Sequence, residues 1–280
     1  MKKRLIARLD IKGQNLCKGI HLEGLRYLGH VHEFASYYYQ NNVDELLYMD
    51  AVASLYARNS LHEIVQKTAE NIFVPLTVGG GLRSLKDIES ILHAGADKVA
   101  INTQAIKDPD FIKQAVEEFG ASTIAISIVA KKSKKDGNYT CYINNGRDNT
   151  KIDTIEWVKR VNDMGAGEIV LTSVDQEGTG RGFDLELIEK AGELVDMPLV
   201  VSGGAGTIEH IIDVAKLEID GVALASMLHY EAVEKMGSSQ DIDISSFKIV
   251  GDKTTSKAFE PHTIPEIKAA LDKNRISCRI

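Results

Sequence analysis

The most informative stretch of this sequence, Val74-Pro-Leu-Thr-Val-Gly-Gly-Gly81, recurs in altered form as Met197-Pro-Leu-Val-Val-Ser-Gly-Gly-Ala-Gly206. Pro75 corresponds to Pro198, which lies 123 positions later. In both places a short apolar run, which predicts a buried strand, ends in a glycine-rich turn. A strand and turn that repeat at this distance predict two copies of one structural unit.

Other landmarks repeat with the same spacing. Asp97–Thr103 aligns with Asp220–Ser226, and Asp44–Asp50 aligns with Gly167–Ser173. Short β-branched runs alternate with longer amphipathic stretches, which is the pattern of a parallel α/β sheet. We therefore predict an α/β fold, a (βα)8 TIM barrel with a twofold internal half-barrel repeat. The expected strands are Leu5–Asp10, Glu45–Asp50, Pro75–Val78, Lys98–Asn102, Thr123–Val129, Glu168–Ser173, Pro198–Ser202 and Gly221–Ala225.

One barrel accounts for the whole chain of 280 residues. Because neither half could close a core alone, we expect a single domain, residues 1–280, made of half-barrels at about 1–122 and 123–280. The helices expected between the strands include Leu85–Ala94, Asp108–Phe119 and Ile155–Met164.

The composition narrows the function classes. A net charge of -7 argues against a general nucleic-acid or membrane-surface binder. Cys17, Cys141 and Cys278 lie far apart and show no metal-ligand spacing, so we expect a reducing, cytoplasmic compartment and neither a metal nor a cofactor. The apolar run near Met1 is too short for a signal peptide or a membrane span. Any site for an anionic ligand must therefore be local.

The two glycine clusters are candidate phosphate sites. Each follows a predicted strand and precedes a helix, where backbone N–H groups can approach an anion. A tight turn without a ligand is the alternative. Two clusters at equivalent barrel positions favour two phosphates, and hence an elongated substrate with a phosphate at each end. The residues concerned are Gly80 and Gly81 with Asn102 and Thr103 in one half, and Gly203 and Gly204 with Ala225 and Ser226 in the other.

The first strand points charged side chains into the barrel. Alternation places Arg4, Ile6, Arg8 and Asp10 on one side, with Asp10 at the carboxyl end, where barrel enzymes place catalytic groups. The alternative for Asp10 is a loop or cap residue. Lys18, in the first loop, could neutralise a phosphate or an enolate; the alternative is a solvated lysine.

Motifs along nearly the whole chain resemble those of the cyclase subunit of imidazole glycerol phosphate synthase, the HisF family. They span about residues 4–230, with a short further match at Thr263–Lys268. The matching runs are Leu9-Asp-Ile-Lys12, Lys18-Gly19, Asp44-Glu-Leu46, Val78-Gly-Gly-Gly-Leu-Arg83, Ala96-Asp-Lys-Val-Ala-Ile-Asn-Thr103, Leu171-Thr-Ser173 and Ser202-Gly-Gly-Ala-Gly206.

The resemblance implies an enzyme of histidine biosynthesis. A glutaminase subunit would deliver ammonia through the N-terminal face of the barrel to a bisphosphorylated ribulosyl aminoimidazole carboxamide. The products would be imidazole glycerol phosphate and an aminoimidazole carboxamide ribotide. The implied catalytic residues are Asp10 and Lys18, and Thr172 joins the two glycine clusters as a substrate-binding residue. The implied ammonia entrance is a ring of Arg4, Glu45, Lys98 and Glu168, with Asp97 beside it facing the partner; a plain buried salt-bridge cluster is the alternative.

Several positions depart from the family pattern. Val129 stands where the family has its second catalytic aspartate, and Arg8 stands where a small neutral residue is expected. Glu177 replaces an aspartate and is our candidate for the missing acid. About thirty residues, 231–262, are inserted after the eighth strand; Gly237 and Phe247–Val250 within them predict a loop and a short strand over the upper face, with a disordered loop as the alternative.

Three functions are consistent with this sequence. The leading prediction is the histidine-pathway cyclase and lyase itself. A diverged HisF-like paralogue, which passes ammonia to an enzyme that amidinates a bacterial surface sugar, would explain Val129, Arg8 and the insertion together. An inert scaffold would predict loss of the charge ring and of the phosphate glycines, and both are present.

Overall fold

The computed structural model describes residues 2–53, 61–236 and 259–279. Eight strands pair in parallel and close on themselves, since β7 pairs with β10 and the last strand, β12, pairs with the first. This closed sheet confirms the predicted (βα)8 barrel, and each predicted strand is present. The barrel strands are β1 (Arg4–Lys12), β4 (Glu45–Asp50), β5 (Leu76–Gly79), β6 (Lys98–Ile101), β7 (Ile124–Lys132), β10 (Glu168–Ser173), β11 (Leu199–Ser202) and β12 (Gly221–Leu224).

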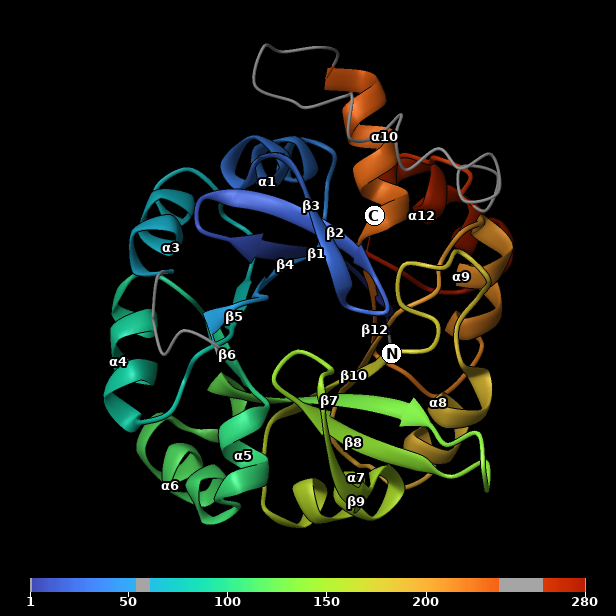
Figure 1. The fold of residues 1–280 in the computed structure, drawn as a ribbon. Helices are drawn as coiled ribbons and strands as arrows, with labels where there is room; N and C mark the ends of the chain where they lie inside the picture. The colour runs from blue at the N-terminus through green and yellow to red at the C-terminus, as the bar shows by residue number, and fades with distance from the viewer. Residues whose placement is uncertain (1, 54–60, 237–258, 280) are drawn as a thin grey trace.

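Helices surround the barrel on its outside (Figure 1). Several begin at residues whose side chains accept backbone N–H bonds, such as Ser84 before α4, Asp153 before α7 and Thr263 before α12. The three helices predicted by range are confirmed, with ends that differ by one or two residues. The helices are α1 (Val31–Gln40), α3 (His62–Ala69), α4 (Leu85–His93), α5 (Thr103–Lys107), α6 (Asp110–Phe119), the 3₁₀ turn η1 (Ala121–Thr123), α7 (Thr154–Asp163), α8 (Leu185–Gly192), α9 (Ile208–Ala215), α10 (Ser226–Met236) and α12 (Ile264–Lys273).

Strand alternation divides the buried side chains into an outer and an inner set. Outward residues of β1, such as Leu5 and Leu9, pack in the large core beneath the helices. The inward Ile6 belongs to a small apolar layer inside the barrel. Arg4, Arg8 and Asp10 share the inward parity of Ile6, as the alternation predicts. The barrel interior is therefore charged at both ends and apolar between them.

Each half-barrel begins with a long strand that continues into an antiparallel hairpin. Strands β2 (Asn15–Ile20) and β3 (Glu23–His30) follow β1, and β8 (Tyr139–Ile143) and β9 (Asp148–Asp153) follow β7. The two hairpins flank the barrel mouth from opposite sides (Figure 1). Lys18, which the sequence places in the first loop, lies in β2 of the hairpin that connects β1 to α1. The half-barrel boundary near residue 123 stays a prediction.

The predicted insertion is only partly described. Its first residues, 231–236, continue α10, because Ala232 and Val233 extend the buried face that begins with Leu228. Gly237 and the predicted strand Phe247–Val250 lie outside the described residues. Within the described ranges, no helix has the length and hydropathy needed to cross a membrane.

Candidate active site

Four charged residues meet at the N-terminal end of the barrel, each of them the first residue of its strand. Arg4 donates to Glu45 at 2.7 Å and to Glu168 at 2.6 Å, and Lys98 lies 3.1 Å and 3.2 Å from the same two carboxylates. Cations and anions therefore alternate in a closed charge ring. Burial lowers the pKa of Arg4, but the two carboxylates more than offset this and hold it above its ordinary value. The predicted cluster exists as an ion-pair network.

The residues above the charge ring are apolar. The inner layer includes Ala100, Ala125 and Ala223, together with Val170 and Val200. Such side chains offer no hydrogen-bonding group that would hold a polar molecule. The interior of the barrel is therefore a packed apolar layer between two charged layers.

Asp97, predicted to face a partner, has a partner within the chain. Its carboxylate accepts the backbone N–H of Leu76 at 2.8 Å. Asp44 accepts from Leu5, and Asp220 accepts from Leu199, in the same way. Each of the three aspartates is the residue just before a barrel strand. Each accepts a backbone N–H near the start of a neighbouring strand. Asp97 is therefore a structural residue, although it is also exposed at this end of the barrel.

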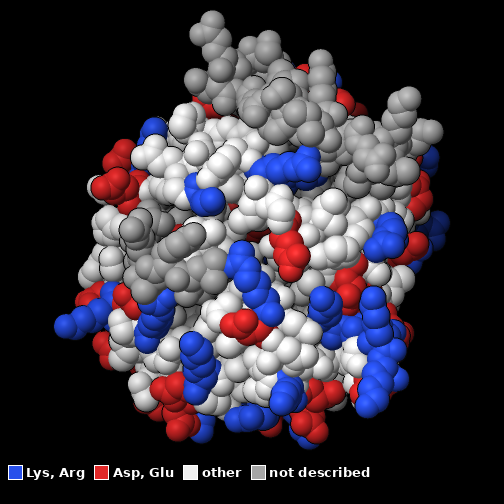
Figure 2. Space-filling view, in the orientation of Figure 1, with Lys and Arg blue, Asp and Glu red and all other residues white. Residues whose placement is uncertain are grey.

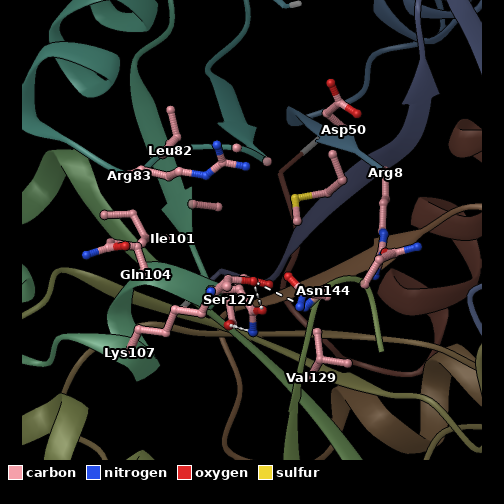
Figure 3. A pocket seen from close by; sticks show the side chains of 17 residues that line it. Arg8, Asp50, Leu82, Arg83, Ile101, Gln104, Lys107, Ser127, Val129 and Asn144 are labelled. Atoms are coloured by element: carbon pink, nitrogen blue, oxygen red, sulfur yellow. Dashed lines mark hydrogen bonds between the residues drawn. The ribbon is translucent and has the colours of Figure 1, made fainter. Parts of the chain in front are cut away.

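The opposite face of the barrel carries basic and acidic side chains interspersed with one another (Figure 2). The first glycine turn, Gly79–Gly81, begins at the end of β5, and its Gly80 and Gly81 line a cavity of about 320 Å³, which we call the first cavity. That volume is in the range of small-molecule sites. Arg83 and Lys107 lie on one side of the cavity and Arg8 on the other (Figure 3). Other lining residues include Asp50, Gly80, Gly81, Asn102, Thr103, Gln104, Ser127, Val129 and Asn144.

The predicted substrate residues Asn102 and Thr103 lie in the first cavity but already have partners. Asn102 Nδ2 donates to the carbonyl of Ser127 at 2.9 Å, and Thr103 Oγ1 accepts the N–H of Asn144 at 3.2 Å. These bonds fix β6 against the second hairpin. Arg83 and Lys107 add positive charge to the lining of this cavity, and Arg83 Nη2 also donates to the carbonyl of Ala53 at 3.2 Å. Only Arg83 stands in a motif that the sequence singled out.

The second glycine turn, Gly203–Gly206, follows β11 and lines a much smaller cavity of about 20 Å³, the second cavity. Ala225 and Ser226 at the end of β12 line it, as predicted, together with Glu177. Phe259 also lines it and was not predicted. Only its place within the inserted residues 231–262 could have drawn attention to it.

Arg8 lies across the upper layer of the barrel interior. It is only 3% exposed, and its Nε donates to Asp10 Oδ1 at 3.1 Å. Its Nη1 donates to Thr172 at 3.0 Å and to Ser202 at 3.2 Å, on β10 and β11. Arg8 is therefore hydrogen-bonded to Thr172, which the sequence predicts to bind substrate, and forms an ion pair with Asp10, which it predicts to be catalytic.

Glu177 is buried in the same charge cluster. Burial raises the pKa of this carboxyl, the nearby Arg8 lowers it, and Asp10 raises it again, so that the pKa stays above its ordinary value. A carboxyl that keeps its proton to higher pH is suited to act as a general acid. Glu177 is thus a buried carboxyl, in the same charge cluster as Arg8 and Asp10, whose protonated form is favoured by burial.

Lys18 is buried rather than extended over the mouth. Its ammonium donates to the hydroxyl of Tyr230 and lies 4.1 Å from the centre of that ring and 5.4 Å from the ring of Phe259. Burial and the nearby Arg26 lower the pKa of Lys18 to about 8, although Glu177 opposes the shift. Lys18 is therefore held by aromatic side chains that the sequence did not associate with it.

Val129 has no polar role in this structure. It packs with Leu22 and Val174 in a separate apolar cluster, against the ring of Tyr142. The two hairpins contribute Leu22 and Tyr142, so this cluster joins both sides of the mouth. No group of three or more potential metal ligands occurs in the part of the chain that the structure describes.

Comparison with known proteins decides the family. The sequence profile described as histidine biosynthesis protein matches residues 4–234. A protein of Legionella pneumophila named imidazole glycerol phosphate synthase subunit HisF is 53% identical over 206 residues, which cover 74% of this chain and 97% of that protein. The chain belongs to the HisF family.

Two further HisF proteins extend the match. HisF of Lactococcus lactis subsp. cremoris is 38% identical over 281 residues, covering 100% of this chain and 97% of its own. HisF of an Exiguobacterium species is 42% identical over 229 residues, covering 82% of this chain and 89% of its own. The family resemblance inferred from the motifs is therefore confirmed. Because the Lactococcus HisF match runs over the whole chain, the HisF likeness includes the C-terminal region.

Proposed function

We propose that this chain is the cyclase and lyase subunit of imidazole glycerol phosphate synthase. It uses ammonia to convert a bisphosphorylated ribulosyl aminoimidazole carboxamide into imidazole glycerol phosphate and an aminoimidazole carboxamide ribotide. Membership of the HisF family supports this function. The predicted cytoplasmic location accords with a biosynthetic enzyme and stays a prediction.

The observation that carries the proposal is the charge ring below an apolar interior. Each charge of the ring is paired with another member of it, so the ring closes the barrel without an unpaired ion. Neutral ammonia crosses an apolar passage at far lower cost than ammonium, because a charge loses its hydration there. We place a glutaminase subunit at this N-terminal face, from which ammonia would pass the ring toward the first cavity.

In the proposed mechanism, the different surroundings of two carboxyl groups make one the base and the other the acid. Asp10, oriented by Arg8, is the base at the upper end of β1, and Glu177, whose pKa is raised by burial, supplies the proton. The substrate phosphates are assigned to the two glycine turns, and Lys18 lies close enough to Glu177 to influence its charge. The acid therefore borders the second phosphate position, and the base is paired with Arg8, which borders the first.

Turnover of the bisphosphorylated ribulosyl substrate with ammonium salts tests this function on the isolated chain. We expect Glu177→Gln to abolish turnover, or Val129→Asp to raise it, because one of them must supply the second proton transfer. A carboxyl at position 129 would lie among apolar side chains, which would raise its pKa and favour the acid form. Indifference to both changes would count against cyclisation.

One observation favours a second function, an ammonia conduit for another enzyme. Val129 lies in an apolar cluster where the family pattern has a catalytic carboxylate, and Arg8 already occupies Asp10 and Thr172. A conduit needs the charge ring and the apolar interior but not the acid–base pair. In that case Glu177→Gln and Val129→Asp would leave partner-dependent amidation unchanged.

Variants of the charge ring test the partner and its face. Arg4→Ala or Glu45→Ala should uncouple the product from glutamine hydrolysis, while turnover with free ammonium persists. Lys216→Ala, which removes only an exposed ion pair with Asp213, is the matched control and should change neither. Equal use of glutamine by all three variants would rule out ammonia entry at the ring. Asp97→Ala is a poorer probe, since it also removes the bond to Leu76.

A further inference from the structure

Lys18 differs from the other buried cations of this chain. Arg8, Lys18 and Lys268 are the lysine and arginine residues that are buried within the described ranges. Arg8 is paired with Asp10 at 3.1 Å, and Lys268 is paired with Asp44 at 2.7 Å. Lys18 is only 6% exposed, yet it forms no ion pair with any residue that the structure describes. Because a buried charge without a counter-ion costs free energy, Lys18 is placed to pair with an anionic ligand.

The ammonium of Lys18 contacts two aromatic side chains instead. It donates to the hydroxyl of Tyr230 and lies 4.1 Å from the centre of that ring and 5.4 Å from the ring of Phe259. The two rings also pack against each other, with centres 5.1 Å apart. An aromatic face attracts a cation, and the hydroxyl oxygen accepts a hydrogen bond from it. Tyr230 therefore offsets part of the cost of burial and fixes the direction of the lysine side chain.

This aromatic pair lies beside the second glycine turn. Phe259, Ser226 and Glu177 all line the second cavity. Tyr230 lies four residues after Ser226, one turn further along α10, so the two side chains share a face of that helix. Glu177 is also close enough to Lys18 to attract its ammonium. Lys18 is therefore held at the edge of the turn that is assigned to the second substrate phosphate.

The charged groups around Lys18 come from several parts of the chain. Arg26, on β3, repels the ammonium, and Glu177, in the loop after β10, attracts it. His229 precedes Tyr230 on α10 and stays neutral at physiological pH, because burial lowers its pKa to about 3. For Lys18 itself, burial and then Arg26 lower the pKa to about 8. Its charge is therefore lost a little above neutral pH, where ligand binding can be measured.

We propose that Tyr230 is a positioning residue, which holds Lys18 beside the second glycine turn so that its ammonium pairs with the second phosphate of the bound substrate. The ring of Tyr230 directs the lysine side chain, and its hydroxyl favours the charged form of Lys18. The phosphate is then the counter-ion of this buried cation. This inference rests on the proposed function, because it concerns how the proposed substrate is held.

Binding of ribulose 1,5-bisphosphate to the intact chain, from about pH 7.5 to 9.5, tests the inference. The second pKa of a phosphate monoester is about 6, so the charge of this probe changes little over that range. Wild-type affinity, measured by isothermal titration calorimetry, should fall on the order of tenfold as the pH rises through about 8, because Lys18 loses its charge. Lys18→Met should bind more weakly and should lack this fall.

Tyr230→Phe keeps the ring and removes only the hydroxyl. Without that hydrogen bond the ammonium of Lys18 is less favoured, so affinity should begin to fall about one pH unit lower than in the wild type. Tyr230→Ala removes the ring as well and admits water to Lys18, so the fall should move to higher pH instead. The two variants thus shift the pH dependence in opposite directions.

A matched control removes a tyrosine hydroxyl elsewhere. Tyr39, on α1, packs against Phe73, which precedes β5 and therefore lies toward the opposite end of the barrel. Tyr39→Phe should leave both the affinity and its pH dependence unchanged. A purely structural role for Tyr230 would weaken binding equally at every pH. That result for Tyr230→Phe, or wild-type pH dependence in Lys18→Met, overturns the inference, and neither observation requires the alanine variant to fold.

Turnover separates this inference from the proposed function. If Tyr230→Phe shifts the pH dependence of bisphosphate binding but the wild type does not turn over the ribulosyl substrate, the proposed function is wrong and the inference holds for a bisphosphorylated ligand. If the wild type turns over the substrate and Tyr230→Phe leaves the pH dependence of its KM unchanged, the inference is wrong and the function holds.

Discussion

The glycine turn after β5 and the glycine turn after β11 lie at equivalent places in the two half-barrels, but their surroundings differ. The first opens into a cavity of about 320 Å³ with Arg83 and Lys107 at its side. The second faces Gly182, Glu177 and Phe259 at close range. The upper ends of β1 and β7 differ in the same way, since one carries Asp10 and the other Val129.

This difference shows that the repeat determines the backbone but not the chemistry. Both halves keep the strand, the hairpin and the glycine turn. The side chains that distinguish them, Arg8, Val129 and Phe259, either break the symmetry or come from the segment after the last strand. A substitution in one half therefore should not have the effect of its counterpart in the other.

Of the variants that compare the two half-barrels, Asp10→Asn, at the upper end of β1, should have the largest effect on turnover. Loss of one acid–base group lowers turnover on the order of 10²–10⁴-fold, while Val129→Asn, its counterpart, should lower turnover far less. Steady-state kinetics with ammonium salts and the bisphosphorylated substrate would measure both. Equal losses in the two variants would mean that position 129 participates in the chemistry.

Alanine at the two glycine turns should differ mainly in stability. A Cβ on Gly204, which has a φ of +114°, would come within 2.0 Å of the carbonyl oxygen of Gly182, so Gly204→Ala should cost about 3 kcal/mol or more. Gly81, with a φ of +73°, lies in the left-handed region, and Gly81→Ala should cost about 1–2 kcal/mol. Urea unfolding measures both.

The same two glycine variants should also differ in anion binding. Titration with inorganic phosphate should show a loss for Gly81→Ala, since its turn borders the open first cavity. In the urea experiment, equal stability losses for Gly81→Ala and Gly204→Ala would mean that the hydrogen bond from the Gly182 N–H to the Gly204 carbonyl does not constrain the second turn.

Glu177→Gln should make the protein more stable at neutral pH. Because burial raises the pKa of this carboxyl in the folded state, ionising it disfavours the fold as the pH rises above the ordinary carboxyl range. The gain in Tm from Glu177→Gln should therefore be absent at pH 4 and should grow toward pH 7.5. A gain that shrinks as the pH rises would mean that Arg8, rather than burial, governs Glu177.

Lys107→Ala should have the smallest effect, a loss of phosphate affinity at the first cavity. Lys107 is exposed at the end of α5 and lines the first cavity, so its loss should weaken ribose 5-phosphate binding about two- to fivefold. The difference should disappear at high salt, because an exposed charge is screened. Lys216→Ala, on an exposed helix elsewhere, provides the control. A loss that persists in high salt would indicate a buried contact.

The sequence alone determined the architecture and most of the family. Short β-branched apolar runs between amphipathic stretches predicted every barrel strand, since the strands of a barrel covered by helices are buried on both faces. Arg4, Glu45, Lys98 and Glu168 could be assigned to one ring through the family resemblance, and all four start their strands at the same end. The sequence also identified Val129 and Arg8 as departures, because a change of residue type is visible without coordinates.

Only the tertiary structure decided what each charged or aromatic side chain contacts. Arg8 reaches Thr172 and Ser202, which lie 164 and 194 positions away, and Lys18 reaches Tyr230 at a separation of 212. Phe259 comes to the second glycine turn by a path that no local pattern encodes. Such contacts depend on how distant segments meet in space, whereas periodicity reports only on neighbours along the chain.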